Sequence, residues 1–236
     1  MNAPPARSVS LNLLHGFQLR APDGIVKLPL GEQRVLAFLA LHGRWLQRLF
    51  VAGNLWLESS EERANASLRT ALWRLRRPDC RLVEATPTHL ALASCVAVDV
   101  RDVSASAERA IRHASDDEDL FELREAGDLL PDWYDDWVII ERERFRQRRL
   151  HALETLCGTL TAASRFAEAT DAALAAIAVE PLRESAHRAL IRAYLAEGNA
   201  GDAIHHYRLF SDLLSRQIGL EPSPQMQDLV SDLPIQ

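Results

Sequence analysis

Arginines at helical spacing fill the segment 61–77, which reads EERANASLRTALWRLRR. At about 100° per residue, one side of a helix here is apolar: Ala64, Leu68, Ala71, Leu72 and Leu75. The opposite side carries a largely basic set: Ala66, Arg69, Thr70, Trp73, Arg74 and Arg77. No acid follows Glu62 in this segment, although solvated faces usually alternate charge sign to gain i,i+4 pairs. Such a helix suits a groove walled by phosphates, and the competing interpretation is an ordinary solvated face.

Individual side chains of this helix suit different parts of a duplex. We expect Arg69 and Thr70 to reach base edges, and Arg74 and Arg77 to contact phosphates. Further phosphate candidates lie close by in the sequence: Arg63, Arg76 and Arg81. Trp73 has three open interpretations: contact with a sugar or a thymine methyl group, packing back on its own domain, or covering a partner surface.

The elements that must hold this helix begin after residues 1–8, which we expect to be a disordered start. Short apolar runs alternate over residues 9–30. Gly16 and the turn Pro22-Asp23-Gly24 separate these runs. The pattern predicts a small antiparallel sheet.

Three helices are predicted after this sheet. The period changes from two to about 3.6 residues, which indicates amphipathic helices over 31–41 and 49–57. Ser59-Ser60 is a plausible N-terminal cap for the arginine-rich helix. Pro78 is expected to end that helix.

A hairpin is predicted next, with strands at 81–85 and 89–93 joined by Thr86-Pro87-Thr88. A sheet, three helices and a terminal hairpin describe a winged helix-turn-helix domain, here over residues 9–98. In that arrangement the third helix enters the major groove, and the wing, here with Thr88, touches the backbone or the minor groove. The competing interpretation of the hairpin is a plain sheet edge.

From residue 99 onward the composition shifts to Ala, Leu, Glu, Asp and Arg, with almost no strand signal. Helices are predicted at 101–114, 118–130, 135–163, 166–179, 183–197, 200–218 and 222–231. Sliding the chain by 34 residues places Phe166–Ala169 on Ala200–Ala203, which is the tetratricopeptide spacing. The expected fold is therefore mainly α, with an all-α tetratricopeptide-like helical repeat domain over 99–236.

Charge is divided unevenly along the chain. The whole chain has a net charge of −6, yet residues 1–98 hold 12 basic and 7 acidic residues, a net +5, and residues 99–236 carry −11. A basic half joined to an acidic half is expected when only one half meets nucleic acid. The sequence has neither an apolar run of about 18 residues nor a signal-peptide segment at its start. We therefore expect a cytoplasmic protein without a membrane partner.

Residue types that could serve catalysis or metal binding lack the required arrangement. The acidic run 116–119 has no calcium-loop pattern and predicts a solvated linker and helix start. His205 and His206 are expected on different helix faces, and nothing places a nucleophile beside a base. A core cluster is predicted for three aromatic residues: Trp133, Tyr134 and Trp137. The cysteines are expected to be buried or inert: Cys80, Cys95 and Cys157. The sequence thus predicts no enzyme, no cofactor and no metal site.

Several stretches of the chain resemble one known family. GRWLQRLFVAGNLW and ANASLRTALWRLRR are similar to the winged helix of the Streptomyces antibiotic regulatory proteins. LLPDWYDDWVIIERERFRQRRLHALETL and EPLRESAHRALIRAYLAEG closely resemble the bacterial transcriptional activator domain of those proteins. The resemblance implies a DNA-binding activator, often of an antibiotic or other secondary-metabolite gene cluster, that binds direct repeats near a promoter and contacts RNA polymerase. Two copies side by side on DNA are expected, because one winged helix reads few bases.

The chain departs from the pattern of that family at three places. Thr88-His89 stands where Gly-Tyr is usual, and a wing turn that needs positive φ would be strained without glycine. Glu32 stands where a basic residue is common, and Trp73 where a small polar residue is usual. These departures, together with Glu61 and Glu62, keep a second interpretation open: a tetratricopeptide-like protein-interaction module with weakened or lost DNA binding.

Overall fold

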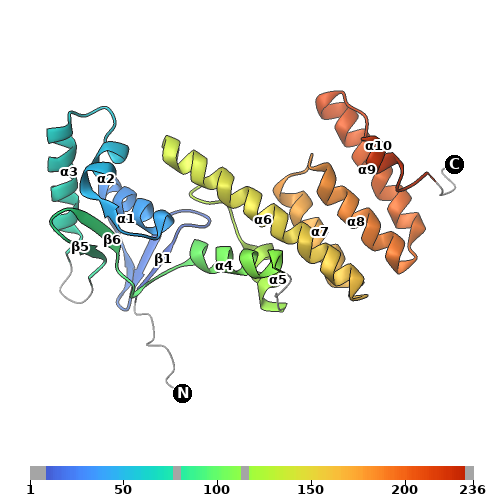
Figure 1. Ribbon diagram of the computed structural model, residues 1–236, viewed down its shortest axis with the longest axis horizontal. Coiled ribbons are helices and arrows are strands. Elements are labelled where there is room, and N and C mark those ends of the chain that lie inside the picture. The colour runs from blue at the N-terminus through green and yellow to red at the C-terminus, as the bar shows by residue number, and fades with distance from the viewer. Residues whose placement is uncertain (1–8, 77–80, 113–116, 232–236) are drawn as a thin grey trace, which may run out of the picture. The chain divides into compact units, whose positions relative to one another are not determined.

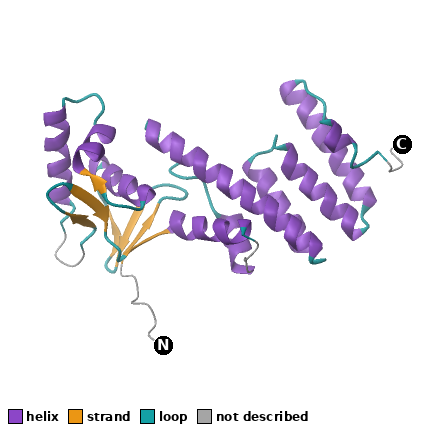
Figure 2. Cartoon of the chain, viewed as in Figure 1, coloured by secondary structure: helices purple, strands orange, loops and turns teal. Residues whose placement is uncertain are grey.

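The computed structural model describes residues 9–76, 81–112 and 117–231 (Figure 1). The chain folds into two compact units. The first runs up to Asp102 and includes Gly127–Glu143, and the second comprises Val103–Ala126 and the chain from Arg144 onward. The strands belong to the N-terminal part, whereas the C-terminal part is helical (Figure 2). The predicted fold class, mainly helical with a small N-terminal sheet, is confirmed.

A four-stranded sheet forms one layer of the first unit. Its strands are β1 (Val9–Asn12), β2 (Gln18–Ala21), β3 (Gly24–Val26) and β7 (Val96–Val98), in the order β3-β2-β1-β7. The pairs β1–β2 and β2–β3 are antiparallel, as the alternating apolar runs predicted. Strand β7 was not predicted, because three residues are too few to show a period; it pairs with β1 in parallel.

A second sheet carries the wing. It contains β4 (Leu46–Gln47), β5 (Val83–Ala85) and β6 (His89–Leu92), in the order β4-β6-β5. The antiparallel pair β5–β6 is the predicted hairpin, with Val83 opposite Leu92. Strand β4 precedes the second helix and anchors β6 through an antiparallel pairing that the sequence did not indicate.

Three helices pack with these sheets. They are α1 (Leu30–His42), α2 (Arg48–Leu55) and α3 (Glu61–Arg74). Gly43 ends α1 in the left-handed conformation, at φ 62°, and its N–H donates to the Leu39 carbonyl. The Ser60 side chain caps α3 by accepting from the Arg63 N–H, as predicted. The helix predicted to run to residue 77 ends at Arg74, and Pro78 lies outside the described residues.

The segment 127–143 belongs to the first unit, although the sequence placed it beyond the boundary at residue 99. Leu14 and Leu129 form an isolated antiparallel bridge, and the Leu130 N–H donates to the Leu13 carbonyl at 2.9 Å. The Arg142 guanidinium donates to the carbonyls of Leu129, Leu130 and Trp133. Such long-range backbone contacts leave no local periodic signal, so residue pattern alone could not show this return of the chain.

The predicted aromatic cluster of this segment is confirmed for two of its three members. Trp133 stacks on Phe17 at a centroid distance of 6.0 Å, and Trp137 meets Phe38 edge-on at 5.1 Å. The prediction for Tyr134 is wrong, because this residue is 82% exposed. Trp133 and Tyr134 precede the start of α6 at Asp136, so helical spacing does not relate these positions, and the aromatic residue types alone could not show which of them is buried.

Within the described residues, seven helices follow β7. They are α4 (Asp99–Ile111), α5 (Asp117–Glu125), α6 (Asp136–Ala162), α7 (Phe166–Val179), α8 (Glu184–Glu197), α9 (Ala200–Ile218) and α10 (Pro224–Gln227). The predicted ranges agree with most of them to within a few residues. The helix predicted over 118–130 ends at Glu125 instead. The residues after it leave the helix, and Leu129 pairs with Leu14, which follows β1 in the chain. The helix predicted over 222–231 is a single turn that the Ser223 side chain caps.

Helices α7, α8 and α9 lie side by side in the second unit (Figure 1). Phe166 begins α7 and Ala200 begins α9, so the residues that the 34-residue shift equates do occupy equivalent places. Helix α7 packs against α8, and the buried side of α7 carries small side chains: Ala169, Ala172, Ala173 and Ala176. A larger apolar cluster follows, with Ile191, Ala203, Phe210, Leu214, Met226 and Val230. Among the described residues, no helix is both long enough and apolar enough to cross a membrane.

Candidate nucleic-acid interface

The sides of α3 are divided as the sequence predicted, except that Leu72 of the predicted apolar stripe is only partly buried and lines a surface groove. The apolar stripe is buried, with Ala64, Leu68, Ala71 and Leu75 each at most 3% exposed. The remaining surface of the helix is exposed at Arg63, Ala66, Arg69, Thr70, Trp73, Arg74 and Arg76. Arg77, a predicted phosphate contact, lies outside the described residues. The buried stripe therefore fixes which side chains α3 can present to a ligand.

The exposed arginines of α3 form two edges. At about 100° per residue, Arg69 lies on one side of the midline and Arg63 and Arg74 on the other, with Trp73 near the midline between them. Arg76 follows the end of the helix and lines the same groove as Arg69. Because a helix in a groove turns its midline toward the base edges and its flanks toward the backbones, the two edges would face opposite phosphate walls. They differ in their surroundings.

The edge with Arg69 and Arg76 borders a groove between α3 and strand β5, which lie next to each other in Figure 1. Its polar lining consists of Arg48, Arg69, Thr70, Arg76 and Arg81. Its apolar lining consists of Leu72, Trp73, Leu75, Leu82, Val83 and Ala85. No carboxylate is among these described lining residues, so the positive charges reinforce one another. We call this surface the wing-side groove.

Five of the predicted site residues meet in the wing-side groove: Arg69, Thr70, Trp73, Arg76 and Arg81. An isolated backbone bridge between Arg76 and Arg81 holds the two arginines of neighbouring segments at one end of it. Leu75 and Leu82, 3% and 2% exposed, form its floor. Long side chains on an apolar floor keep their charged ends at the rim, where an anion could reach them.

Arg48 was missed by the sequence analysis. It is the first residue of α2, its backbone N–H donates to the Thr88 carbonyl at 2.9 Å, and its guanidinium donates to the Thr86 carbonyl at 3.4 Å. A cation in the first turn of a helix opposes the helix dipole. That unfavourable placement in the sequence is a signal that could have drawn attention to Arg48, because it is expected where an external anion balances the charge.

A second groove lies between the start of α3 and the wing. Its lining combines Arg48, Arg69, Thr88 and His89 with two acids, Glu61 and Glu62, and with Gln47, Leu49, Asn65 and Pro87. The predicted wing contact Thr88 is therefore close to the start of α3, but in mixed charge. The acids occupy the first turn, where carboxylates favour the helix dipole.

The wing closes without glycine. The Thr86 side-chain oxygen accepts from the His89 N–H at 2.9 Å and from the Thr88 N–H at 3.4 Å. The Thr86 N–H in turn donates to the His89 carbonyl at 2.9 Å. No residue from Thr86 to His89 has positive φ. The strain that we expected from the missing glycine is thus absent, because a threonine side chain makes the turn.

The other edge of α3 is partly neutralised. Arg74 donates to Glu32 of α1 at 3.3 Å. The Glu32 side chain is only 3% exposed, whereas that of Arg74 is 54% exposed. Glu32, which stands where a basic residue is common, therefore has Arg74 as its partner in the fold. The role of Arg74 as a phosphate contact stays a prediction. Arg63 is exposed on the same edge, and within the described residues its guanidinium has no such ion pair.

Alternative sites do not assemble within the described residues. Groups of His, Cys, Asp and Glu that could hold a metal are not found there. The acidic run near 116–119 is not wholly a solvated linker, as we had expected: Asp119 is fully buried and accepts from Arg109. His205 is exposed while His206 packs on His187, so the predicted separation of the two histidines is confirmed.

The fold is a winged helix with a basic exposed face, followed by a domain of paired helices. The family model described as "Bacterial transcriptional activator domain" matches residues 93–233. The chain belongs to this family, and the resemblance to the Streptomyces antibiotic regulatory proteins is confirmed.

Two known proteins illustrate the relationship. The regulatory protein AfsR of Streptomyces coelicolor is 29% identical over 218 residues, which cover 84% of this chain and 21% of AfsR. The chain thus spans about a fifth of the length of that relative. A structure of Mycobacterium tuberculosis EmbR, in complex with a low affinity phosphopeptide, superposes with a TM-score of 0.70 at 21% identity. It covers 95% of this chain and 64% of EmbR, which shows that the fold is shared.

Proposed function

We propose that the protein binds double-stranded DNA through α3 and the wing, and activates transcription from nearby promoters. The observation that carries this proposal is the wing-side groove, where Arg48, Arg69, Arg76 and Arg81 converge without a carboxylate in the described lining. Release of counterions from a duplex makes such a surface bind phosphates in any sequence. Arg69 and Thr70 lie on either side of the midline of α3 and closer to it than Arg74 does, and we propose that they read base edges.

A salt series of mobility shifts tests this proposal. Arg76→Ala is expected to weaken binding to all duplexes and to flatten the plot of log affinity against log salt by about 0.9. Arg69→Ala is expected to reduce the preference for the cognate site by about 1–3 kcal/mol. Arg216→Ala serves as the control, because this arginine of α9 is 81% exposed and pairs only with Asp212 in the described ion pairs. Equal slopes for wild type and Arg76→Ala contradict the phosphate assignment.

The proposal includes direct repeats and two copies of the chain side by side. A single winged helix contacts few base pairs, so neighbouring copies add specificity that one copy lacks. A footprint on promoter-proximal DNA is expected to show two protected half-sites in the same orientation, separated by about one helical turn or a multiple. Protection of a single half-site at saturating protein contradicts this arrangement.

Activation is proposed to require contact with RNA polymerase, at promoters that include those of an antibiotic or other secondary-metabolite cluster. Such a role places the protein with the chromosome in the bacterial cytoplasm. Transcription in vitro with purified polymerase is expected to rise with added protein on a promoter that carries the footprinted repeats. The matched template has the repeats scrambled, and equal transcription from both templates contradicts recruitment.

A second candidate function is a protein-interaction module with weakened DNA binding. Glu32, which engages Arg74, and the acids Glu61 and Glu62 beside the wing favour it. Binding that is undetectable at low salt, where phosphate contacts are strongest, together with a partner retained by the helical unit, is its expected outcome.

A further inference from the structure

Trp73 occupies the middle of the exposed side of α3. At about 100° per residue it lies between Arg69 on one side and Thr70 on the other, one turn further toward the C-terminus. Ala66, two turns earlier, falls on almost the same line. Midline residues approach the base edges most closely when a recognition helix enters the major groove. Trp73 is therefore placed to meet bases rather than phosphates.

The indole of Trp73 is available for such a contact. Trp73 is 70% exposed, so it does not fold back on its own domain, which removes one of the three interpretations of the sequence. No ring contact, cation–π contact or hydrogen bond of its side chain is found among the residues that the structure describes. Trp73 shares the lining of the wing-side groove with Leu72 and Val83, so the groove beside it is partly apolar.

The small size of Ala66 and the bulk of Trp73 have a geometric consequence. A helix can approach the floor of the groove closely at an alanine, whereas an indole on the same line holds the backbone further away. The start of α3 thus enters deepest, and Trp73 fills the wider space that remains toward the other end. The feature of the major groove that projects into this space and is apolar is the 5-methyl group of thymine.

We propose that Trp73 contacts the 5-methyl group of a thymine and gives the protein a preference for thymine at one position of its site. This inference rests on the proposed DNA binding and adds a specificity-determining residue to it. Burial of one methyl group against an apolar surface changes affinity by about fourfold. An uncharged indole contributes nothing to the count of released counterions, so Trp73 separates base preference from salt dependence.

Duplexes selected by the wild-type protein from a randomised pool provide the probe. In the selected duplex each thymine is replaced by uracil, one position at a time, which removes a single methyl group and keeps all hydrogen bonds. For wild type, uracil at one position is expected to lower affinity about fourfold. For Trp73→Ala the same replacement is expected to have no effect, while the salt slope equals that of wild type. Tyr134→Ala, a change at an aromatic residue 82% exposed and outside both grooves, is the control and should behave as wild type.

The outcomes separate the inference from the proposed function. A wild-type protein that binds no duplex with salt-dependent affinity contradicts DNA binding itself. If wild type binds but every uracil replacement is neutral, the methyl contact does not exist. A Trp73→Ala variant with reduced affinity for thymine and uracil duplexes alike assigns Trp73 to a sugar contact and overturns the inference. An unchanged preference in Trp73→Ala assigns the indole to a protein partner and likewise overturns it.

Discussion

The guanidinium of Arg74 donates a hydrogen bond to the carboxylate of Glu32, 42 residues earlier in the chain. The oxygen is 3.3 Å from the donor, and the Glu32 side chain is almost completely buried. This contact joins α3 to α1, which packs at its buried side. It therefore helps to set the orientation in which α3 presents its other arginines. We therefore expect Arg74 to position the helix, while Arg48, Arg76 and Arg81 of the wing-side groove are the proposed phosphate contacts.

Replacement of Arg74 by alanine is expected to destabilise the fold, because Glu32 then stays buried without a cation. The expected loss is about 1–2 kcal/mol, since Arg74 is half exposed and water can reach part of the pair. Urea unfolding measures it. The variant Arg74→Ala with Glu32→Gln should recover most of the loss, because the amide needs no cation. A stable Arg74→Ala protein whose salt slope has nevertheless fallen would restore Arg74 to the phosphate contacts.

Much of the N-terminal fold could be predicted because its signals are local. The stripe of α3 was readable from Ala64, Leu68 and Ala71 alone, and their burial fixed the exposed side without further information. The helical repeat was readable in the same way, since one period repeats along the chain. Local spacing thus determined which side chains of α3 could meet a ligand.

The remaining features depend on contacts between distant residues. Arg48 joins the candidate site only because β4 pairs with β6 and brings the start of α2 to the wing. The Arg74–Glu32 ion pair and the pairing of Leu129 with Leu14 also join residues that are far apart in the sequence. Sequence spacing on one helix carries no information about such partners. The structure was therefore needed to distinguish an arginine that pairs within the fold from the arginines that are proposed to contact DNA.

The paired histidines of the second unit predict a loss of stability in acid. The Pro181 carbonyl lies 2.9 Å from His187 Nε2, which must therefore carry a proton and donate. His187 Nδ1 then accepts from His206 Nε2, also at 2.9 Å. Burial, followed by the neighbouring histidines, lowers the pKa of His206 to about 4, and burial lowers the pKa of His187. A second proton on either ring would break this arrangement.

The sign of the effect follows from the lowered pKa values. Above pH 6.5 both the folded and the unfolded chain keep these rings neutral, and stability is unaffected by them. As the pH falls from 6.5 to about 4, the unfolded chain binds protons that the folded chain excludes, so stability falls through this range. His206→Gln should reduce this acid sensitivity in urea titrations at several pH values, whereas His205→Gln should have a much smaller effect, because His205 is exposed and is the smallest of the causes that lower the pKa of His206. Identical curves for wild type and His206→Gln would exclude the histidine pair as the cause.

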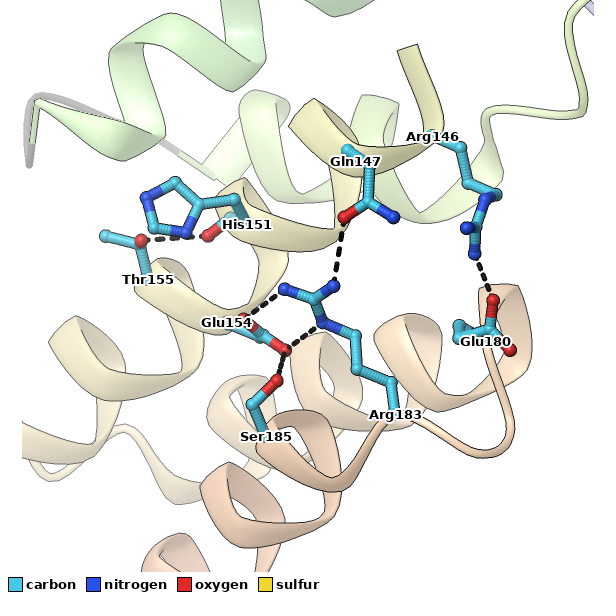
Figure 3. A network of polar contacts seen from close by, with 8 residues as sticks. All are labelled: Arg146, Gln147, His151, Glu154, Thr155, Glu180, Arg183 and Ser185. Carbon is cyan, nitrogen blue, oxygen red and sulfur yellow. Dashed lines mark hydrogen bonds and ion pairs between the residues drawn. The ribbon is translucent and has the colours of Figure 1, made fainter. Parts of the chain in front are cut away.

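A polar network joins α6 to the start of α8 in the second unit (Figure 3). Arg183 donates to both oxygens of Glu154, at 2.6 and 3.2 Å, and to Gln147 at 3.1 Å, while Ser185 donates to Glu154 at 2.5 Å. Burial raises the pKa of Glu154, but the hydrogen bonds from Arg183 and Ser185 outweigh it, so the pKa is lowered. The stabilisation that goes with this lowering is present above pH 4.5 and is lost as the pH falls below it.

Arg183→Ala is expected to reverse that dependence. Without its cation Glu154 keeps the burial that raises its pKa, so the variant should lose about 1–3 kcal/mol near neutral pH and less as the carboxyl becomes protonated. Thermal or urea unfolding of the whole protein at pH 7 and pH 4.5 measures the difference. Adding Glu154→Gln to Arg183→Ala should restore stability at pH 7. A loss that is the same at both pH values would mean that the packing of the Arg183 stem, and not its charge, supports this junction.

The wing provides the last prediction, because its turn depends on one hydroxyl group. Thr86→Ala removes the acceptor for the N–H groups of His89 and Thr88, while the strand pairing between Val83 and Leu92 stays in place. Faster hydrogen exchange is expected at these two amides alone, with DNA affinity reduced several-fold and global stability reduced by about 1 kcal/mol or less. Thr86→Ser keeps the hydroxyl and should preserve both slow exchange and affinity. If exchange accelerates in Thr86→Ala but affinity is unchanged, the wing does not contact DNA, and the hairpin is the plain sheet edge of the competing interpretation.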